Sequence, residues 1–265
     1  MAESTFDRHA FAGSLGTLRI GRSLYTRAEV DSTNDWAWRA LASGAEDGAA
    51  FVADRQRAGR GREGRAWHTT PGKGLALSLL LTLERPPRAV GVVPLAAGLA
   101  LARGIERLGL KTRLKWPNDL LVGSSKLAGI LCESRRTPRG AWAVVVGVGV
   151  NVSQQREEFP REVGEQATSL ALEGCGASRE HVAAELLNAL EPLWDVMATR
   201  GAETVLEAWR ARATFWGQPV TVRSLGRAQS GIATGLDDGG GLMLDQGGRT
   251  VVVLAGDLDV GAASG

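Results

Sequence analysis

Apolar runs separated by short polar segments predict the secondary structure of residues 23 to 213. Strands are expected at 23–30, 49–56, 74–83, 113–122, 126–134 and 141–152, and helices at 34–44, 90–108, 178–199 and 201–213. Ser32 or Thr33 is placed to cap the first of these helices. The run GLALSLLLTL at 74–83 is apolar on both strand faces, which is typical of a strand in the middle of a sheet. The mixed order of strands and helices predicts an α+β domain, in which helices flank a mixed α/β sheet.

The pattern changes near Phe215. From Gly217 onward, short strand-like runs alternate with glycine-rich turns such as DDGGG and QGG. This alternation is typical of a small all-β barrel. We therefore expect two domains, one at 1–215 with its core starting near residue 22, and a C-terminal β-barrel at 216–265.

Charge, apolar runs and cysteines indicate where in the cell the protein works, but they do not identify a partner. The net charge is only +2, and the longest apolar runs are too short to span a bilayer. The N-terminal residues do not resemble a signal peptide. The two cysteines, Cys132 and Cys175, have neither metal-ligand spacing nor the pattern of a disulfide framework. These features predict a cytoplasmic protein that does not enter a membrane.

Positive charge is concentrated in residues 55–67, RQRAGRGREGRAW, which contain five arginines and three glycines. Clustered guanidinium groups need anionic partners before they can pack, so we expect residues 57–66 to be mobile until a bound anion orders them. The segment GRGREG formally fits a dinucleotide-binding turn, but no helix pattern follows it, and the chain has no P-loop motif. A basic surface loop and an arm that binds nucleic acid are alternatives that this segment alone leaves open.

Two further polar clusters interrupt apolar strands. In KWPNDLLVGSSKLAGIL, Pro117 places Asn118 and Asp119 in a turn, and Lys126 begins the next strand. An ammonium group beside an apolar strand needs a partner, unless its side chain simply reaches water at the strand edge. A third cluster, VVGVGVNVS, contains Asn151 after glycines that permit a close backbone approach. Beside an arginine-rich loop, these groups indicate the handling of phosphate and Mg²⁺.

The order of these segments closely resembles that of bacterial biotin–protein ligases. The resemblance covers about residues 22–258 and rests on STN at 32–34, QRAGRGREGRAW at 56–67, KWPND at 115–119, KLAGIL at 126–131 and GVGVNVS at 147–153. The C-terminal segment resembles the SH3-like domain of the same family. Glu63 departs from the pattern, because many members carry a basic residue there. Only about twenty residues precede the first strand, so we expect the short class that lacks an N-terminal DNA-binding domain.

The resemblance implies that ATP first activates biotin to biotinyl-5′-AMP, and that a lysine of a biotin carboxyl carrier protein then accepts the biotinyl group. It implies catalytic roles for Lys126, Arg60 and Arg62, because the first step joins two anions. The implied biotin-binding residues are Ser32, Thr33, Asn34, Gln56, Arg60, Gly61, Arg62, Lys126 and Gly129. The implied ATP- and adenylate-binding residues are Gly59, Arg60, Arg62, Arg65, Trp67, Lys115, Asn118, Lys126 and Asn151.

Two further expectations concern the surroundings of the ligands. Asp119 is expected near the Mg²⁺ ion that accompanies ATP. Strand 74–83, Trp116 and the LAGIL strand are expected to supply apolar walls for the rings and tail of biotin.

Two rival functions differ from this interpretation. A lipoate–protein ligase of the same superfamily would share the catalytic fold and the adenylate chemistry, although the GRGR loop and the barrel favour biotin. A regulator that binds nucleic acid through the basic loop belongs to another class of protein. No recognition helix or basic face is visible in the sequence, so specific DNA binding is not expected. The sequence leaves open whether the protein is a monomer or a homodimer.

Overall fold

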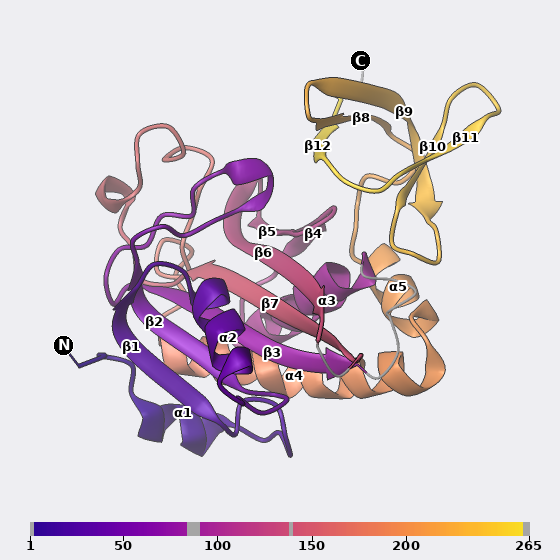
Figure 1. Ribbon diagram of the computed structural model, residues 1–265. Coiled ribbons are helices and arrows are strands. Elements are labelled where there is room, and N and C mark those ends of the chain that lie inside the picture. The colour runs from indigo at the N-terminus through magenta and orange to yellow at the C-terminus, as the bar shows by residue number, and fades with distance from the viewer. Residues whose placement is uncertain (1–2, 84–90, 138–139, 262–265) are drawn as a thin grey trace.

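The computed structural model describes residues 3–83, 91–137 and 140–261 and contains a large mixed sheet with flanking helices (Figure 1). Seven strands pair in the order β1-β2-β3-β7-β6-β5-β4, where β1 and β2 are parallel and the other neighbours are antiparallel. The predicted α+β class is confirmed. The strands are β1 (Leu24–Val30), β2 (Ala50–Gln56), β3 (Gly74–Leu83), β4 (Arg113–Lys115), β5 (Asp119–Val122), β6 (Ser125–Arg136) and β7 (Trp142–Asn151).

Helices cover both faces of this sheet (Figure 1). They are α1 (Arg8–Ser14), α2 (Thr33–Ala42), α3 (Val92–Arg107), α4 (Arg179–Arg200) and α5 (Glu203–Arg210). The sequence pattern did not indicate α1. Asp7 caps this short helix, because its carboxylate accepts hydrogen bonds from the backbone N–H groups of His9 and Ala10. The helix buries Phe11. No helix in the described part of the chain is both long and apolar enough to cross a membrane.

Strand β3 is buried on both faces, as its sequence predicts. Leu75, Leu77 and Leu79 belong to the main core, which β3 shares with α3 and α4. Leu80 faces the opposite way and packs in a second cluster with residues of α2 such as Trp36. Ser78 is also completely buried, although it is polar. A buried hydroxyl needs hydrogen-bond partners, and those of Ser78 lie in the pocket described below.

The C-terminal strands form a second, antiparallel sheet of five strands in the order β11-β10-β9-β8-β12. This finding confirms the expected small β domain, whereas the boundary at residues 215 and 216 stays a prediction. Trp116 is fully buried, and its Nε1 donates to the carbonyl oxygen of Gly240 at 3.0 Å, which links a turn of the large sheet to a turn of the C-terminal sheet. The strands are β8 (Pro219–Ser224), β9 (Arg227–Leu236), β10 (Leu242–Asp245), β11 (Thr250–Val253) and β12 (Asp257–Val260).

Candidate functional site

A cavity of about 520 Å³ brings the separate sequence clusters together. Gly59 is the one predicted ligand-binding residue that does not line it; this glycine instead permits a tight turn, because an added Cβ would lie 2.4 Å from the carbonyl oxygen of Trp67. The predicted residues that do line the cavity are Ser32, Thr33, Asn34, Gln56, Arg60, Gly61, Arg62, Arg65, Trp67, Lys115, Asn118, Asp119, Lys126, Gly129 and Asn151.

One side of the cavity is an uncharged polar cluster at the start of α2. The backbone N–H of Thr33 donates to Gln56 Oε1 at 2.8 Å, and the Thr33 hydroxyl donates to the same oxygen at 3.0 Å. Ser78 Oγ lies 2.8 Å from Thr33 Oγ1 and 2.6 Å from Asn34 Oδ1. Ser32 occupies the N-cap position, but its side chain makes no capping hydrogen bond. The expected hydroxyl cap is therefore wrong, because Gln56 satisfies the first turn of the helix instead.

Asn34 is fixed by groups that are distant in the sequence. Its Nδ2 donates to the carbonyl oxygen of Leu131 at 3.3 Å and to Glu133 Oε2 at 3.2 Å, and Trp38 Nε1 donates to the same carboxylate oxygen at 2.9 Å. An added Cβ on Gly147 would lie only 2.3 Å from Asn34 Oδ1, which explains the glycine there. Asn34 is buried, and both ends of its amide have partners within the chain.

The arginine loop, residues 55–67, has a defined turn at its centre. The backbone N–H of Gly61 donates to Arg65 O at 2.7 Å, and that of Trp67 donates to Gly59 O at 2.9 Å. An isolated antiparallel bridge between Arg60 and Ala66 lies between these two hydrogen bonds. The loop is therefore a narrow hairpin-like turn that crosses one side of the cavity.

Carboxylates of the chain itself neutralise several of the loop arginines. Arg60 forms two hydrogen bonds with Asp35, at 2.6 and 2.7 Å, and lies 3.4 Å from Glu133. Arg57 pairs with Asp31 at 2.7 Å. The hydrogen bond from Arg60 lowers the pKa of Asp35, and the same contact raises the pKa of Arg60. The premise that only a bound anion could order this loop is therefore wrong.

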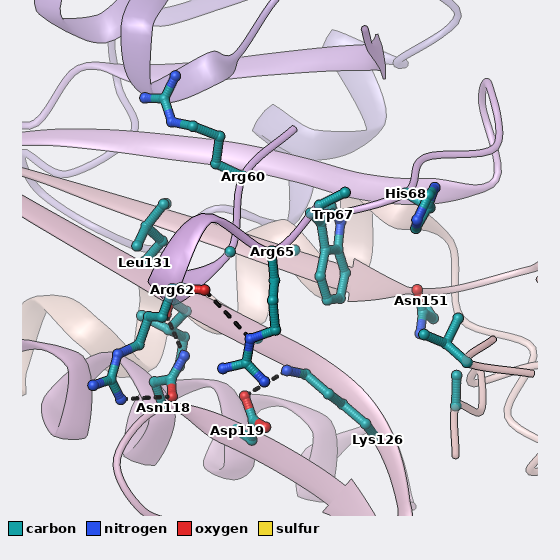
Figure 2. A pocket seen from close by; sticks show the side chains of 18 of the residues that line it. Arg60, Arg62, Arg65, Trp67, His68, Asn118, Asp119, Lys126, Leu131 and Asn151 are labelled. Atoms are coloured by element: carbon teal, nitrogen blue, oxygen red, sulfur yellow. Dashed lines mark hydrogen bonds and ion pairs between the residues drawn. The ribbon is translucent and has the colours of Figure 1, made fainter. Parts of the chain in front are cut away.

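Arg62 and Arg65 lie on the opposite side of the loop from Arg60. Figure 2 shows Arg62 and Arg65 beside Asn118 and Lys126, whereas Arg60 points away from them. Arg62 Nη1 donates to Asn118 Oδ1 at 3.3 Å, and burial lowers the pKa of the Arg62 guanidinium. Two guanidinium groups and one ammonium group thus gather at one end of the cavity, where they can receive an anion.

Lys126 has a carboxylate partner rather than only a path to solvent. Its Nζ lies 2.7 Å from Asp119 Oδ1, and the two side chains are 34% and 19% exposed. The backbone N–H of Lys126 donates to Gln166 O at 2.6 Å, and its carbonyl oxygen accepts from the N–H of Thr168 at 2.9 Å. The main chain on which the ammonium group is mounted is therefore held on both sides.

Trp67 and Asn151 complete the polar end. An added Cβ on Gly149 would lie 2.3 Å from the Trp67 indole, so the ring rests directly on β7, and Lys126 Nζ lies 5.9 Å from its centre. Asn151 is buried and donates to Thr168 O at 2.9 Å. Its amide therefore fixes the segment after β7, and the glycines of β6 and β7 accommodate side chains of the protein itself.

The apolar walls only partly match the sequence expectation. The LAGIL strand contributes Ile130 and Leu131, as expected. Strand 74–83 and Trp116 do not line the cavity, because β3 is covered on both faces and Trp116 packs toward the C-terminal sheet. Phe159 and Val163 supply further apolar surface. Neither residue was expected from the sequence, where their signal is two apolar side chains within the polar stretch at 154–166.

Comparison with known proteins places this site in a class of ligases. Residues 27–151 match the model of the biotin/lipoate A/B protein ligase family, and residues 215–261 match that of the biotin protein ligase C-terminal domain. The biotin–(acetyl-CoA-carboxylase) ligase of Mycobacterium tuberculosis is 42% identical over 246 residues, which cover 89% of this chain and 88% of that protein. The bifunctional ligase/repressor BirA of Bacillus spizizenii is 33% identical over 93% of this chain and 77% of its own length.

The solved structure of the biotin protein ligase from Aquifex aeolicus in complex with biotin and ATP has the same fold, with a TM-score of 0.76 and 28% identity over 91% of this chain and 100% of that one. The chain belongs to the biotin–protein ligase family. The ligase of Mycobacterium tuberculosis and the structure from Aquifex aeolicus are named for biotin, which decides the alternative between a biotin and a lipoate ligase in favour of the biotin enzyme.

Proposed function

We propose that this protein activates biotin with ATP to form biotinyl-5′-AMP and transfers the biotinyl group to a lysine of a biotin carboxyl carrier protein. The observation that carries the proposal is the polarity of the cavity. An uncharged cluster around Thr33 and Asn34 lines one part of it, and Arg62, Arg65 and Lys126 gather in another. This division suits a ligand with a neutral polar head and a carboxylate that meets a phosphate.

In the first step, a carboxylate oxygen of biotin attacks the α-phosphorus of ATP, and the bond from that phosphorus to the pyrophosphate oxygen breaks. Two negatively charged groups must approach each other, so the step needs fixed positive charge. Lys126 and Arg62 supply it, and the carboxylate of Asp119, 2.7 Å from Lys126 Nζ, keeps the ammonium group directed. Arg65 adds a second guanidinium that can contact phosphate oxygens.

The uncharged end would hold the ureido ring of biotin, which offers one acceptor oxygen and two N–H donors. Ser32 lines the cavity with a hydroxyl that does not cap α2, and Gln56 and Thr33 present further polar groups. Ser78 and Glu133 lie behind this layer and hold Asn34 in place. A neutral ligand head suits this end because Ser32, Thr33, Asn34 and Gln56 are uncharged and Arg60 is paired with Asp35.

Mg²⁺ would enter as MgATP, held largely by the phosphates. Among the described residues, no group of three or more His, Cys, Asp or Glu side chains could hold a metal ion. Sites for MgATP commonly use only one or two protein carboxylates with substrate phosphates, so one nearby carboxylate is compatible with this role. The position of Asp119 beside Lys126 supports a counter-ion role more directly, and its predicted place near Mg²⁺ stays a prediction.

In the second step, the deprotonated amine of the acceptor lysine attacks the carbonyl carbon of the mixed anhydride, and AMP leaves as the amide forms. The groups that bound the phosphate then stabilise the departing AMP. The carrier protein as acceptor, a cytoplasmic location and the absence of specific DNA binding stay predictions, and the oligomeric state stays open.

The direct test is ATP–pyrophosphate exchange. The purified protein with MgATP and labelled pyrophosphate should exchange label only when biotin is present, and lipoate at the same concentration should not replace it. Exchange without biotin, or equal exchange with lipoate, would contradict the proposal.

A further inference from the structure

The tip of the arginine loop touches the C-terminal sheet at two points. Ser224 Oγ donates to Glu63 Oε1 at 2.8 Å, and Arg65 Nη2 donates to Asp257 Oδ1 at 2.7 Å. Ser224 ends β8 and Asp257 begins β12, and these strands are antiparallel neighbours in which Asp257 pairs with Arg223. The two contacts therefore come from adjacent positions on one rigid part of the C-terminal sheet.

The tip is a tight turn, closed by the hydrogen bond from the backbone N–H of Arg65 to Arg62 O at 3.1 Å. Glu63 and Gly64 lie inside this turn, with φ values of +54° and +75°. A left-handed conformation is unfavourable for a residue other than glycine and persists only where surrounding contacts stabilise it. The hydrogen bond from Ser224 to the Glu63 carboxylate is such a contact.

Glu63 is also the position at which this chain departs from the basic residue that many members of the family carry. A carboxylate accepts the proton of the Ser224 hydroxyl, whereas the positively charged side chain of lysine or arginine has no acceptor atom to offer. The hydrogen bond that Ser224 donates to the loop therefore needs the acceptor of Glu63, whereas a basic residue could contact Ser224 only as a donor.

We propose that Ser224 and Asp257 are positioning residues, through which the C-terminal sheet holds the arginine loop closed over the cavity. With the tip fixed, Arg62 reaches Asn118, and Arg65 stays beside Lys126. Asp257 also offsets the mutual repulsion of these cations before a phosphate arrives. The inference rests on the proposed function, because a closed loop matters most for a mixed anhydride that water would hydrolyse after escape.

The experiment measures how much biotinyl-AMP escapes from the protein when biotin and MgATP are present without an acceptor. Ser224→Ala and Asp257→Ala should each raise the escape rate about threefold, and the double variant about tenfold, the range expected for two exposed polar contacts. Trypsin should cut the loop faster in the same order. Ser230→Ala is the matched control, since its hydroxyl pairs with Thr221 on the same sheet at 2.8 Å and should change neither rate.

A double-mutant cycle separates positioning from a general loss of stability. Glu63→Ala should raise escape as much as Ser224→Ala, and combining the two should add nothing. Glu63→Gln keeps an acceptor oxygen and should behave as the wild type. Additive effects of Glu63→Ala and Ser224→Ala on the escape rate would overturn the inference. An unchanged escape rate in the Ser224→Ala/Asp257→Ala variant would overturn it as well. A failure of the proposed ligase function would give another result, because the wild-type protein itself would then show no biotin-dependent ATP–pyrophosphate exchange.

Discussion

Replacing Lys126 with glutamine removes the charge proposed to join the two anions while preserving most of its surroundings. Lys126 Nζ lies 2.7 Å from Asp119 Oδ1, and glutamine replaces this ammonium group by a neutral amide on a shorter side chain. The backbone bonds of residue 126 to Gln166 and Thr168 do not involve the side chain. Because the lysine side chain is 34% exposed, losing its charge should cost the fold no more than about 1 kcal/mol.

The same substitution should slow the chemical step far more than it affects stability. Removing one preorganised group that stabilises charge in a transition state costs about 10²–10³ in rate, or about 3–4 kcal/mol. Single-turnover formation of biotinyl-AMP at saturating biotin and MgATP measures this effect. Lys73→Gln is the matched control, because Lys73 Nζ lies 2.7 Å from Glu158 Oε1 and outside the cavity. A Lys126→Gln protein with the wild-type melting temperature that forms biotinyl-AMP within about threefold of the wild-type rate would refute the catalytic role of Lys126.

Three further predictions concern the rest of the site. Ser78→Ala leaves Asn34 Oδ1 without its hydroxyl partner, so it should raise the KM for biotin about tenfold with little change in the KM for ATP; equal changes in both constants would contradict the role of the cluster. Arg60 lowers the pKa of Asp35 below its ordinary value of 3.8, so the ionised Asp35 stabilises the fold above pH 3.8, and this stabilisation is lost as the pH falls through the lowered pKa. The difference in free energy of unfolding between wild type and Asp35→Asn, at most about 1 kcal/mol for this exposed pair, should therefore vanish at low pH, and a difference independent of pH would argue against the ion pair. Trypsin should cut the loop at 57–66 slowly in the ligand-free protein and more slowly still with biotin and MgATP, whereas equal rates would show that ligands do not stabilise the loop.

Long elements with a strong hydrophobic pattern could be predicted closely from the sequence. The expected strand at 74–83 is β3, and the expected helix at 178–199 is α4, which spans Arg179–Arg200. Helix α1 could not be found in this way. It has seven residues, only Phe11 among them is buried, and such a short segment shows no clear period.

Residue type was enough to predict that Lys126 and Arg62 lie at one cavity, whereas their catalytic roles stay predictions. The site was not predictable where the partner of a side chain depends on the register of the sheet. Glu133 joins Asn34, Trp38 and Arg60 across separations of 73 to 99 residues, which no local pattern encodes. The carboxylate partners of the arginines were missed for the same reason. Ser78 did leave a signal, since it is a hydroxyl in the middle of an apolar strand, and a buried hydroxyl requires a partner.

The central claim is that this protein joins biotin to a carrier lysine through an adenylate. Intact-mass spectrometry of a purified biotin carboxyl carrier domain, incubated with the protein, biotin and MgATP, tests it most directly. The account predicts that one biotinyl group appears on a single lysine, that the gain requires both substrates, and that Lys126→Gln slows it by about 10²–10³. A carrier domain that stays unmodified while the ligase is folded and both substrates are present would contradict the account.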